Sequence, residues 1–304
     1  MKGVETMRFN KRKLILLFCL MLFSVNFISC NNNVNDNIDT KGFIWVASKD
    51  NITINLIGTI HPAPPSLNFF NDNVNEILEN TDILSVEVDT TNPNNTSIKQ
   101  KLLVNNTNIS AKDILSNDEV QYLETLLASP NFDLDYLSTL PPVSVISLID
   151  RAVYSKENYS TSFDSQLLNR SKKMNIEINE LENLEFQVKL LNNSYTWQDV
   201  KDYIAINRDS KLQKASKDYL AATFDAYING NIEFFENDLK KVKIEKPDFY
   251  EEFVTKRNIA MAQSIDSIVK DGRRHTIAIG CKHFIGADSV LTHLKKLGYK
   301  VTRL

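Results

Sequence analysis

Two stretches of the chain share one hydrophobic pattern, an uninterrupted apolar run that ends in Gly-x-x-His. The first covers residues 56–61 and the second covers residues 276–283. An apolar run of this length predicts a β-strand that is covered on both faces, and the glycine lets the chain turn sharply as it leaves the sheet. Open α/β sheets bind ligands at the carboxyl ends of their strands, so we expect His61 and His283 to face one crevice.

The rest of the chain alternates short β-rich runs with segments of helical spacing, which predicts an α/β fold with a mixed sheet and helices on both faces. Residues 197–243 are almost entirely helical and polar, which indicates a helical insertion or cap around 195–247. The predicted strands are 43–47, 52–57, 83–89, 176–182, 276–279 and 299–303, and the predicted helices are 67–80, 111–129, 143–154, 161–174, 184–191, 248–271 and 287–297.

A predicted strand and a predicted helix carry charged residues that are candidates for the crevice. The alternation of strand 83–89 turns Glu87 and Asp89 to the same side near the strand's end. Arg257 interrupts an apolar stripe that repeats every fourth residue along helix 248–271. A guanidinium that faces a core needs an acceptor, so Arg257 is either a structural ion pair, possible with Glu87, or a site residue that faces the crevice.

The N-terminal segment predicts a secreted lipoprotein. A basic cluster at residues 11–13 precedes an apolar block at 14–25, too short for a membrane span, and Phe27-Ile28-Ser29-Cys30 resembles a lipoprotein box. Residues 1–29 are therefore predicted to be a signal peptide, Cys30 the lipidated residue, and 30–41 an Asn-rich tether before a domain at 42–304. The predicted location is then the bacterial cell envelope, where the protein would be a membrane-anchored lipoprotein. An ordinary cleaved signal peptide that happens to contain a cysteine is the alternative.

The net charge excludes some classes of binding partner, and the number of cysteines excludes a disulfide. Residues 1–29 hold five of the 35 Lys and Arg and one of the 38 Asp and Glu, so the mature chain has a formal charge of −7. A mildly acidic body argues against nucleic acid or an anionic lipid surface as partner. Cys19 lies in the signal and Cys30 would be acylated, which leaves Cys281 alone and no disulfide available.

Six motifs occur in an order that resembles the TraB/GumN family, which includes the animal Tiki proteases. The resemblance covers roughly residue 43 to the C-terminus, although residues 90–160 and 195–250 match only in helical character. The motifs are Gly58-Thr59-Ile60-His61, Val86-Glu87-Val88-Asp89, Asp164 ahead of Leu167-Leu168, Leu181-Glu182 before Phe186-Gln187, Arg257-Asn258 before Met261-Ala262, and Gly280-x-x-His283-Phe284-x-Gly286.

The resemblance implies a fold related to the erythromycin esterases and the ChaN-like haem-binding lipoproteins. It also implies a divalent metal (Mn, Co or Zn) and a peptidase activity. Carried over residue by residue, His61, His283 and Glu87 would hold the metal, Glu87 and Arg257 would be catalytic, and Asp89, Asp164, Glu182 and Asn258 would support them, Asp89 by orienting a histidine. The chain departs from the family at Cys281 and Lys282, where smaller residues are usual.

Two classes of function therefore stay open. In the first, a metal-dependent hydrolase acts on a peptide or protein, with an ion that acidifies a water and Arg257 stabilising the oxyanion. In the second, a non-catalytic envelope lipoprotein binds haem or a signalling peptide in the same crevice. The two histidines could also be ordinary core residues, Asp164 a helix-N-terminal acid and Glu182 an acid beside a cap.

Overall fold

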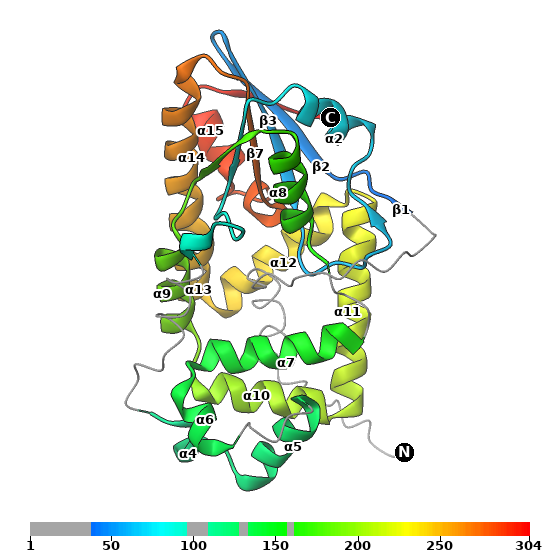
Figure 1. Ribbon diagram of the computed structural model, residues 1–304, viewed down its shortest axis with the longest axis vertical. Helices are drawn as coiled ribbons and strands as arrows, with labels where there is room; N and C mark the ends of the chain where they lie inside the picture. Colours follow the sequence, from blue (N-terminus) through cyan, green and yellow to red (C-terminus); the bar gives the residue numbers. More distant parts are fainter. Residues whose placement is uncertain (1–37, 96–108, 128–132, 157–160) are drawn as a thin grey trace, which may run out of the picture.

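A six-stranded mixed sheet forms the centre of the molecule (Figure 1). The computed structural model describes residues 38–95, 109–127, 133–156 and 161–304. The strands lie in the order β6-β5-β7-β3-β2-β8; the first four are mutually parallel, and β2 pairs antiparallel with both β3 and β8. Their bounds are β2 Phe43–Lys49, β3 Ile52–Thr59, β5 Ile83–Val86, β6 Glu177–Glu180, β7 His275–Gly280 and β8 Lys300–Arg303.

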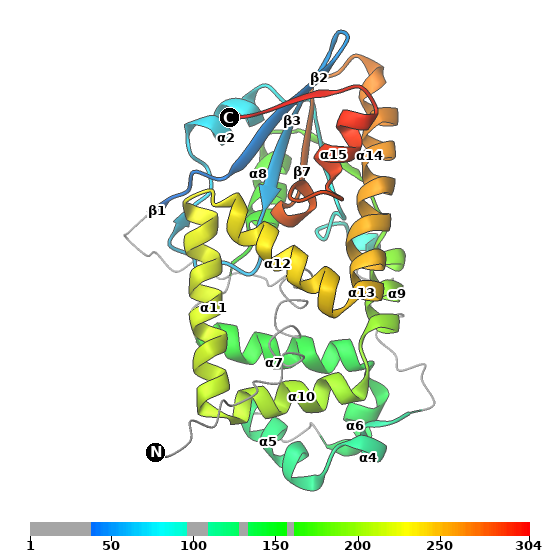
Figure 2. The same cartoon turned by 180° about the vertical axis from the view of Figure 1, so that it is seen from behind.

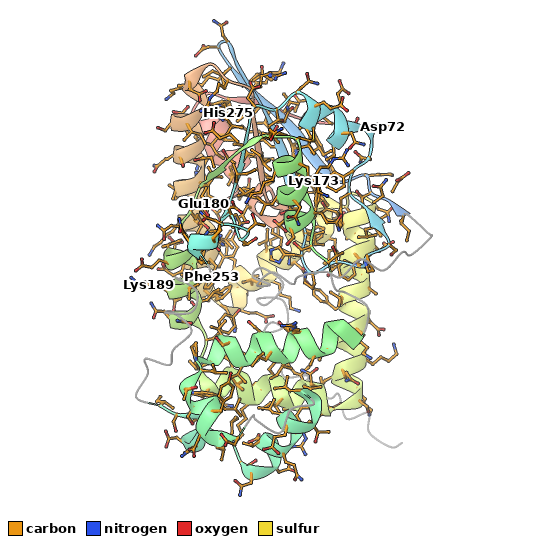
Figure 3. All side chains as sticks on the ribbon, viewed as in Figure 1. Asp72, Lys173, Glu180, Lys189, Phe253 and His275 are labelled. Atoms are coloured by element: carbon orange, nitrogen blue, oxygen red, sulfur yellow. The ribbon has the colours of Figure 1, made fainter. Side chains whose placement is uncertain are left out.

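Helices cover both faces of this sheet, which confirms the predicted α/β class. Helices α2 (Asp72–Glu79) and α8 (Phe163–Lys173) lie on one face, while α14 (Arg257–Ile268) and α15 (Val290–Lys296) lie on the other (Figures 1 and 2). Two residues labelled in Figure 3 show the direction of the parallel strands. His275 is the first residue of β7 and lies at the amino ends of these strands, whereas Glu180 is the last residue of β6 and lies at their carboxyl ends.

The two strands that carry the Gly-x-x-His motifs are immediate neighbours. β3 and β7 pair in parallel, with Gly58 opposite Ile279 and Thr59 opposite Gly280. The two motifs are therefore offset by one residue, yet both strands end at the same edge of the sheet. This pairing brings the segments that hold the two histidines together, as the repeated pattern predicts.

A layer of helices lies beyond the carboxyl edge of the sheet, and the long helix α11 runs from it back toward the sheet (Figures 1 and 2). The predicted cap at 195–247 consists of helices joined by short connections, but the layer also contains residues 111–127 and 133–156, because α10 packs against α4, α5 and α7. The helices of this region are α4 Ala111–Ile114, α5 Asn117–Leu127, α6 Leu134–Thr139, α7 Pro142–Lys156, α9 Leu184–Ser194, α10 Trp197–Arg208, α11 Ser210–Ile228, α12 Ile232–Glu245 and α13 Pro247–Tyr250.

Aromatic packing attaches α11 and α12 to the sheet. The Phe43 ring on β2 contacts the rings of Tyr227 on α11 and Phe235 on α12, at centroid distances of 5.3 Å and 5.4 Å. All three side chains are buried. The Tyr227 hydroxyl also donates a hydrogen bond of 2.7 Å to the carbonyl of Gly58. These contacts hold two helices of the insertion directly over the ends of the motif strands.

Two predictions near the N-terminus are wrong in their boundaries. The predicted helix 67–80 begins only at Asp72, because the Asn71 side chain caps it by accepting from the Val74 N–H. Leu67–Asn68 instead forms the short strand β4, which pairs with β1, Ile38–Asp39. The last part of the predicted tether 30–41 is thus ordered, while the predicted signal peptide and Cys30 lie outside the described residues.

Other elements are shorter or more divided than predicted. The strand expected at 83–89 ends at Val86, and the helix expected at 111–129 breaks between α4 and α5. The segment expected as one helix at 248–271 contains a π-helical turn at Glu251–Lys256 before α14 and a 3₁₀ turn at Val269–Asp271 after it. No helix within the described ranges is long and apolar enough to cross a membrane.

Candidate active site

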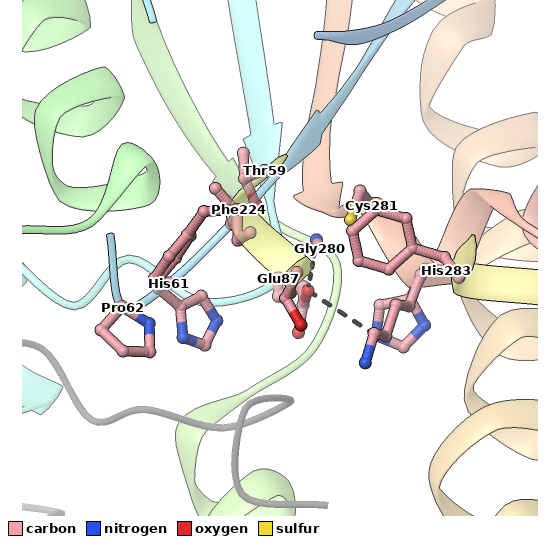
Figure 4. A pocket seen from close by; sticks show the side chains of 12 residues that line it. Thr59, His61, Pro62, Glu87, Phe224, Gly280, Cys281 and His283 are labelled. Carbon is pink, nitrogen blue, oxygen red and sulfur yellow. Dashed lines mark hydrogen bonds and ion pairs between the residues drawn. The ribbon is translucent and has the colours of Figure 1, made fainter. Parts of the chain in front are cut away.

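A pocket opens at the edge of the sheet where β3, β5 and β7 end (Figure 4). Its volume, including the open mouth, is about 480 Å³. The floor comes from the segments that follow the strands, and one wall comes from α11 and α12. The lining residues are Thr59, Ile60, His61, Pro62, Glu87, Thr223, Phe224, Phe235, Gly280, Cys281, Lys282 and His283.

The glycines of the two motifs do more than allow a turn, because they also let neighbouring segments of the chain pack closely. Gly58 lies within β3, and a Cβ built there would be 2.8 Å from the Cβ of Phe43 and 2.9 Å from the Cα of Cys281. Since real Cβ atoms do not approach so closely, only glycine lets the 281–284 turn pack on β3. Gly280 uses its backbone, because its N–H donates to Glu87 Oε1 at 2.9 Å. Gly286 has a positive φ of 86°.

Glu87 is held by a buried network of charges. Arg257 Nη2 donates to Glu87 Oε2 at 2.7 Å, and Arg257 Nε and Nη2 donate to the two oxygens of Glu182 at 2.8 Å and 2.6 Å. Gln187 Nε2 donates to both carboxylates. Burial opposes the ionisation of Glu87, yet the charges of His283 and Arg257 and the Gly280 N–H outweigh it and lower its pKa. Glu87 is therefore a carboxylate at neutral pH.

Arg257 does not face the pocket, contrary to the prediction. Its side chain is 0% exposed and lies behind Glu87, which separates it from the pocket. The predicted need for an acceptor is met by the two glutamates, so the arginine is a bidentate clamp on Glu182 that also fixes Glu87. In this position the guanidinium contacts the pocket-lining residues through Glu87.

His283 is fixed in one tautomer by Asn258. The amide nitrogen of Asn258 donates to the carbonyl of Asp288 at 2.7 Å, which leaves its Oδ1 to accept from His283 Nδ1 at 2.6 Å. A proton on Nδ1 leaves Nε2 with a lone pair, and this atom is 3.7 Å from Glu87 Oε1. Burial, helped by the charge of Arg257, lowers the pKa of His283 to about 4, so the imidazole is neutral at neutral pH.

His61 lies across the pocket. Figure 4 draws it and His283 on opposite sides of Glu87. Its charge contributes to the pKa of both Glu87 and His283, which puts its ring within electrostatic reach of them. The other histidine of a strand, His275, begins β7 at the far edge of the sheet and hydrogen-bonds Asp271 at 2.8 Å.

The fit of a metal ion to these residues is partial. Glu87 Oε1 and His283 Nε2 are 3.7 Å apart, whereas two ligands at roughly 2.1 Å from one tetrahedral ion would be roughly 3.4 Å apart. Within the described residues, however, no three His, Cys, Asp or Glu side chains are arranged to hold an ion. The separation of Glu87 Oε1 and His283 Nε2 is therefore slightly wider than that of two ligands on one ion, and His61 does not complete a set of three among the described residues.

One of the predicted supporting residues, Asp89, occupies another place than expected, whereas the other three contact residues at the site. Asp89 does not orient a histidine: its carboxylate accepts from the backbone and hydroxyl of Thr91 and from Lys172 Nζ, the last at 3.0 Å. Asp164 opens α8 and accepts from the Thr59 hydroxyl at 2.6 Å, so it supports the end of β3. Glu182 and Asn258, by contrast, bind Arg257 and His283 directly.

Several residues in and around the pocket have little or no signal in the sequence. Gln187 bridges Glu87 and Glu182 from α9, and its motif position after Leu181-Glu182 is its only sequence mark. The aromatic wall of Phe224 and Phe235 comes from α11 and α12, in a stretch whose sequence pattern predicts only polar helices. Lys282 stands beside His283 in the lining, and its only mark in the sequence is its departure from the family pattern.

The fold and the pocket define an α/β protein with a buried Glu-Arg-Glu network and two histidines at the carboxyl edge of a mixed sheet. Residues 43–303 match the model of the TraB/PrgY/gumN family, and the chain belongs to this family. No curated protein and no solved structure matches the chain.

Proposed function

We propose that this protein is a hydrolase of the bacterial cell envelope that cleaves a peptide bond in the pocket formed by His61, Glu87 and His283. The observation that carries the proposal is the pair of Glu87 and His283. An ionised carboxylate and a neutral imidazole with its lone pair toward it face one another across 3.7 Å in a pocket. Buried groups with perturbed pKa values of this kind are typical of catalytic sites.

The supporting residues hold these two groups ready. Arg257 and the Gly280 N–H fix one oxygen each of Glu87, and Asn258 fixes the ring of His283. Glu87 Oε1 and His283 Nε2 are then the atoms able to accept a proton from a water or to bind a cation. Arg257 is a positioning residue, because it acts through Glu87.

Glu87, His283 and His61 would hold a divalent cation, Mn, Co or Zn. Such an ion would supply an acidified water and would polarise a carbonyl. The pocket wall of Phe224 and Phe235 excludes water on one side and offers apolar surface to a peptide side chain. A lipid anchor at Cys30 would keep this activity at the membrane.

The test is cleavage of a set of quenched-fluorescent peptides by the purified full chain, with and without added Mn, Co or Zn. Glu87→Gln keeps the size of the side chain but removes its charge, so we expect it to lose at least about a hundredfold in rate. Glu185→Gln, which changes an exposed glutamate paired with Lys189 on α9, is the control and should keep full rate. Cleavage by Glu87→Gln at the rate of the unmodified protein would overturn the proposal. If metal binds but no peptide is cleaved, the site is that of a binding protein.

A further inference from the structure

Asp288 does not line the pocket, yet its backbone carbonyl determines which way the side-chain amide of Asn258 faces. Asn258 is 0% exposed, its Nδ2 donates to this carbonyl at 2.7 Å, and its Oδ1 is 2.6 Å from His283 Nδ1. A carbonyl can only accept, so the amide nitrogen faces Asp288 and the amide oxygen faces the imidazole. The direction of this chain of hydrogen bonds is therefore set at Asp288.

This direction decides which ring nitrogen of His283 carries the proton. While Asn258 Oδ1 faces the ring, the proton lies on Nδ1, and Nε2 has a lone pair directed to the pocket. A half-turn of the amide would place its nitrogen against Nδ1 and move the proton to Nε2. A protonated Nε2 of a neutral imidazole can neither bind a cation nor accept a proton. The orientation of Asn258 thus decides whether His283 can act.

The side chain of Asp288 fastens this carbonyl to the helical layer. Its Oδ2 accepts from Lys243 Nζ on α12 at 2.7 Å and from the Tyr250 hydroxyl on α13 at 3.1 Å. The Lys243 ammonium also lies 5.0 Å from the centre of the Tyr250 ring, and Tyr250 is buried. Two donors on one oxygen, from two helices, hold residue 288 in place against Asn258.

Helix α12 follows the whole segment that carries His283. Phe235, Leu239 and Lys243 recur every fourth residue and therefore lie on one face of this helix. In the same order, they lie against Lys282, Gly286 and Asp288. Because Phe235 is also a wall of the pocket, one helix connects the pocket wall with the residue that orients Asn258.

We infer that Asp288 is a positioning residue for His283. Its carboxylate, bound by Lys243 and Tyr250, holds its carbonyl against Asn258, and this contact keeps the lone pair of His283 Nε2 directed to the pocket. The inference rests on the proposed function, because it concerns the imidazole of the same site. It makes α12 and α13 of the helical layer part of the support of that site.

The experiment reads the tautomer of His283 directly. The full chain is produced with isotope-labelled histidine and kept free of metal, and NMR correlates the ring nitrogens with the ring C–H protons at neutral pH. The signals of His283 are identified by their loss in His283→Gln. We expect one form in the unmodified chain, with the proton on Nδ1, and a second form with the proton on Nε2 in Asp288→Ala. Asp288→Asn keeps an oxygen that accepts from Tyr250 and should retain the single form.

The affinity for cobalt ion, measured by calorimetry, gives a second readout. Loss of an outer partner of a metal-bound histidine typically costs about ten- to a hundredfold in affinity, so Asp288→Ala should bind cobalt about tenfold or more weakly. The matched control is Asp266→Ala, a change to an aspartate of α14 outside the pocket. Asp266 accepts from Lys49 at 3.2 Å and from Lys270 at 2.8 Å. Its tautomer and cobalt affinity should equal those of the unmodified chain.

Several results would overturn the inference. They are a single Nδ1-protonated form of His283 in Asp288→Ala, a mixture of forms already in the unmodified chain, the same mixture in Asp266→Ala, and unchanged cobalt affinity in Asp288→Ala. If Asp288→Ala does not fold, the double variant with Lys243→Met and Tyr250→Phe takes its place. The absence of the second form in that variant then overturns the inference.

The tautomer also separates this inference from the proposed function. If the tautomer of His283 depends on Asp288 but no peptide is cleaved, the proposed hydrolase fails and the positioning role of Asp288 stands. If peptides are cleaved and the tautomer does not depend on Asp288, the hydrolase stands and the positioning role fails.

Discussion

Asp150 gives the helical layer a stability that depends on pH, and Asp150→Asn should remove that dependence. Asp150 on α7 is 8% exposed, and the Tyr203 hydroxyl on α10 donates a hydrogen bond to it. Burial raises the pKa of Asp150 from its ordinary 3.8 to about 7, and the bond from Tyr203 offsets only part of this rise. The pair lies where α7 packs on α10.

The size and sign of the effect on the free energy of unfolding follow from the difference between the pKa of Asp150 in the folded chain and its ordinary pKa. A rise of about 3 units corresponds to about 4 kcal/mol between the protonated and ionised forms. The folded chain holds the proton more tightly than the unfolded chain, so the contribution is complete below pH 3.8 and is lost as pH rises to about 7. Asp150 thus lowers the free energy of unfolding by up to about 4 kcal/mol across this range.

The assay is urea unfolding followed by circular dichroism at several pH values between about 5 and 8. As pH rises, the free energy of unfolding of the unmodified chain should fall relative to that of Asp150→Asn. Asp225→Asn, a change at an exposed aspartate of α11, controls for charge alone. Tyr203→Phe removes the bond that lowers the pKa of Asp150 and should move the transition to higher pH. If the difference in unfolding free energy between the two chains stays constant from pH 5 to pH 8, Asp150 does not have a raised pKa.

Three further changes test other parts of the structure. Arg257→Lys keeps the charge but loses the two hydrogen bonds of the guanidinium to Glu182, so we expect the free energy of unfolding to fall by about 1–3 kcal/mol. We also expect weaker metal binding, because Glu87 loses its fixed position. A fall in stability with unchanged metal binding would make Arg257 purely structural. Cys30→Ser should release the protein from membranes in a fractionation experiment, and retention with normal processing would contradict the lipoprotein prediction. Gly58→Ala places a methyl 2.9 Å from the Cα of Cys281 and should cost about 1–3 kcal/mol in thermal unfolding; an unchanged melting temperature would contradict the close packing.

The sequence predicts the centre of the fold because its signal is local and repeated. The apolar runs before Gly58 and Gly280 specify two strands buried on both faces, and such strands are neighbours in a parallel sheet. Arg257 in an apolar stripe likewise requires buried acceptors, and Glu87 and Glu182 supply them. These inferences need only the polarity of each position, which the sequence contains.

The parts that could not be predicted depend on partners far along the chain. Strand alternation turns Asp89 toward Glu87 only if the strand continues, but the Asp89 N–H bonds to the Glu180 side chain at 2.6 Å and the ladder ends at Val86. Lys172 then captures the Asp89 carboxylate. The π-helical turn before Arg257 has no mark in the apolar spacing, because the stripe residues stay buried through it.

The metal content of single variants shows whether His61, Glu87 and His283 share one divalent ion. The full chain and its single variants are loaded with Mn, Co or Zn and dialysed, and their metal content is measured by mass spectrometry. The control is His293→Ala, a change to a histidine of α15 that does not line the pocket. We expect one ion per chain in the unmodified protein and in the control, and none in His61→Ala or His283→Ala, because two ligands alone form a weak site. Stoichiometric metal in both of these variants, or none in the unmodified protein, would contradict the shared site.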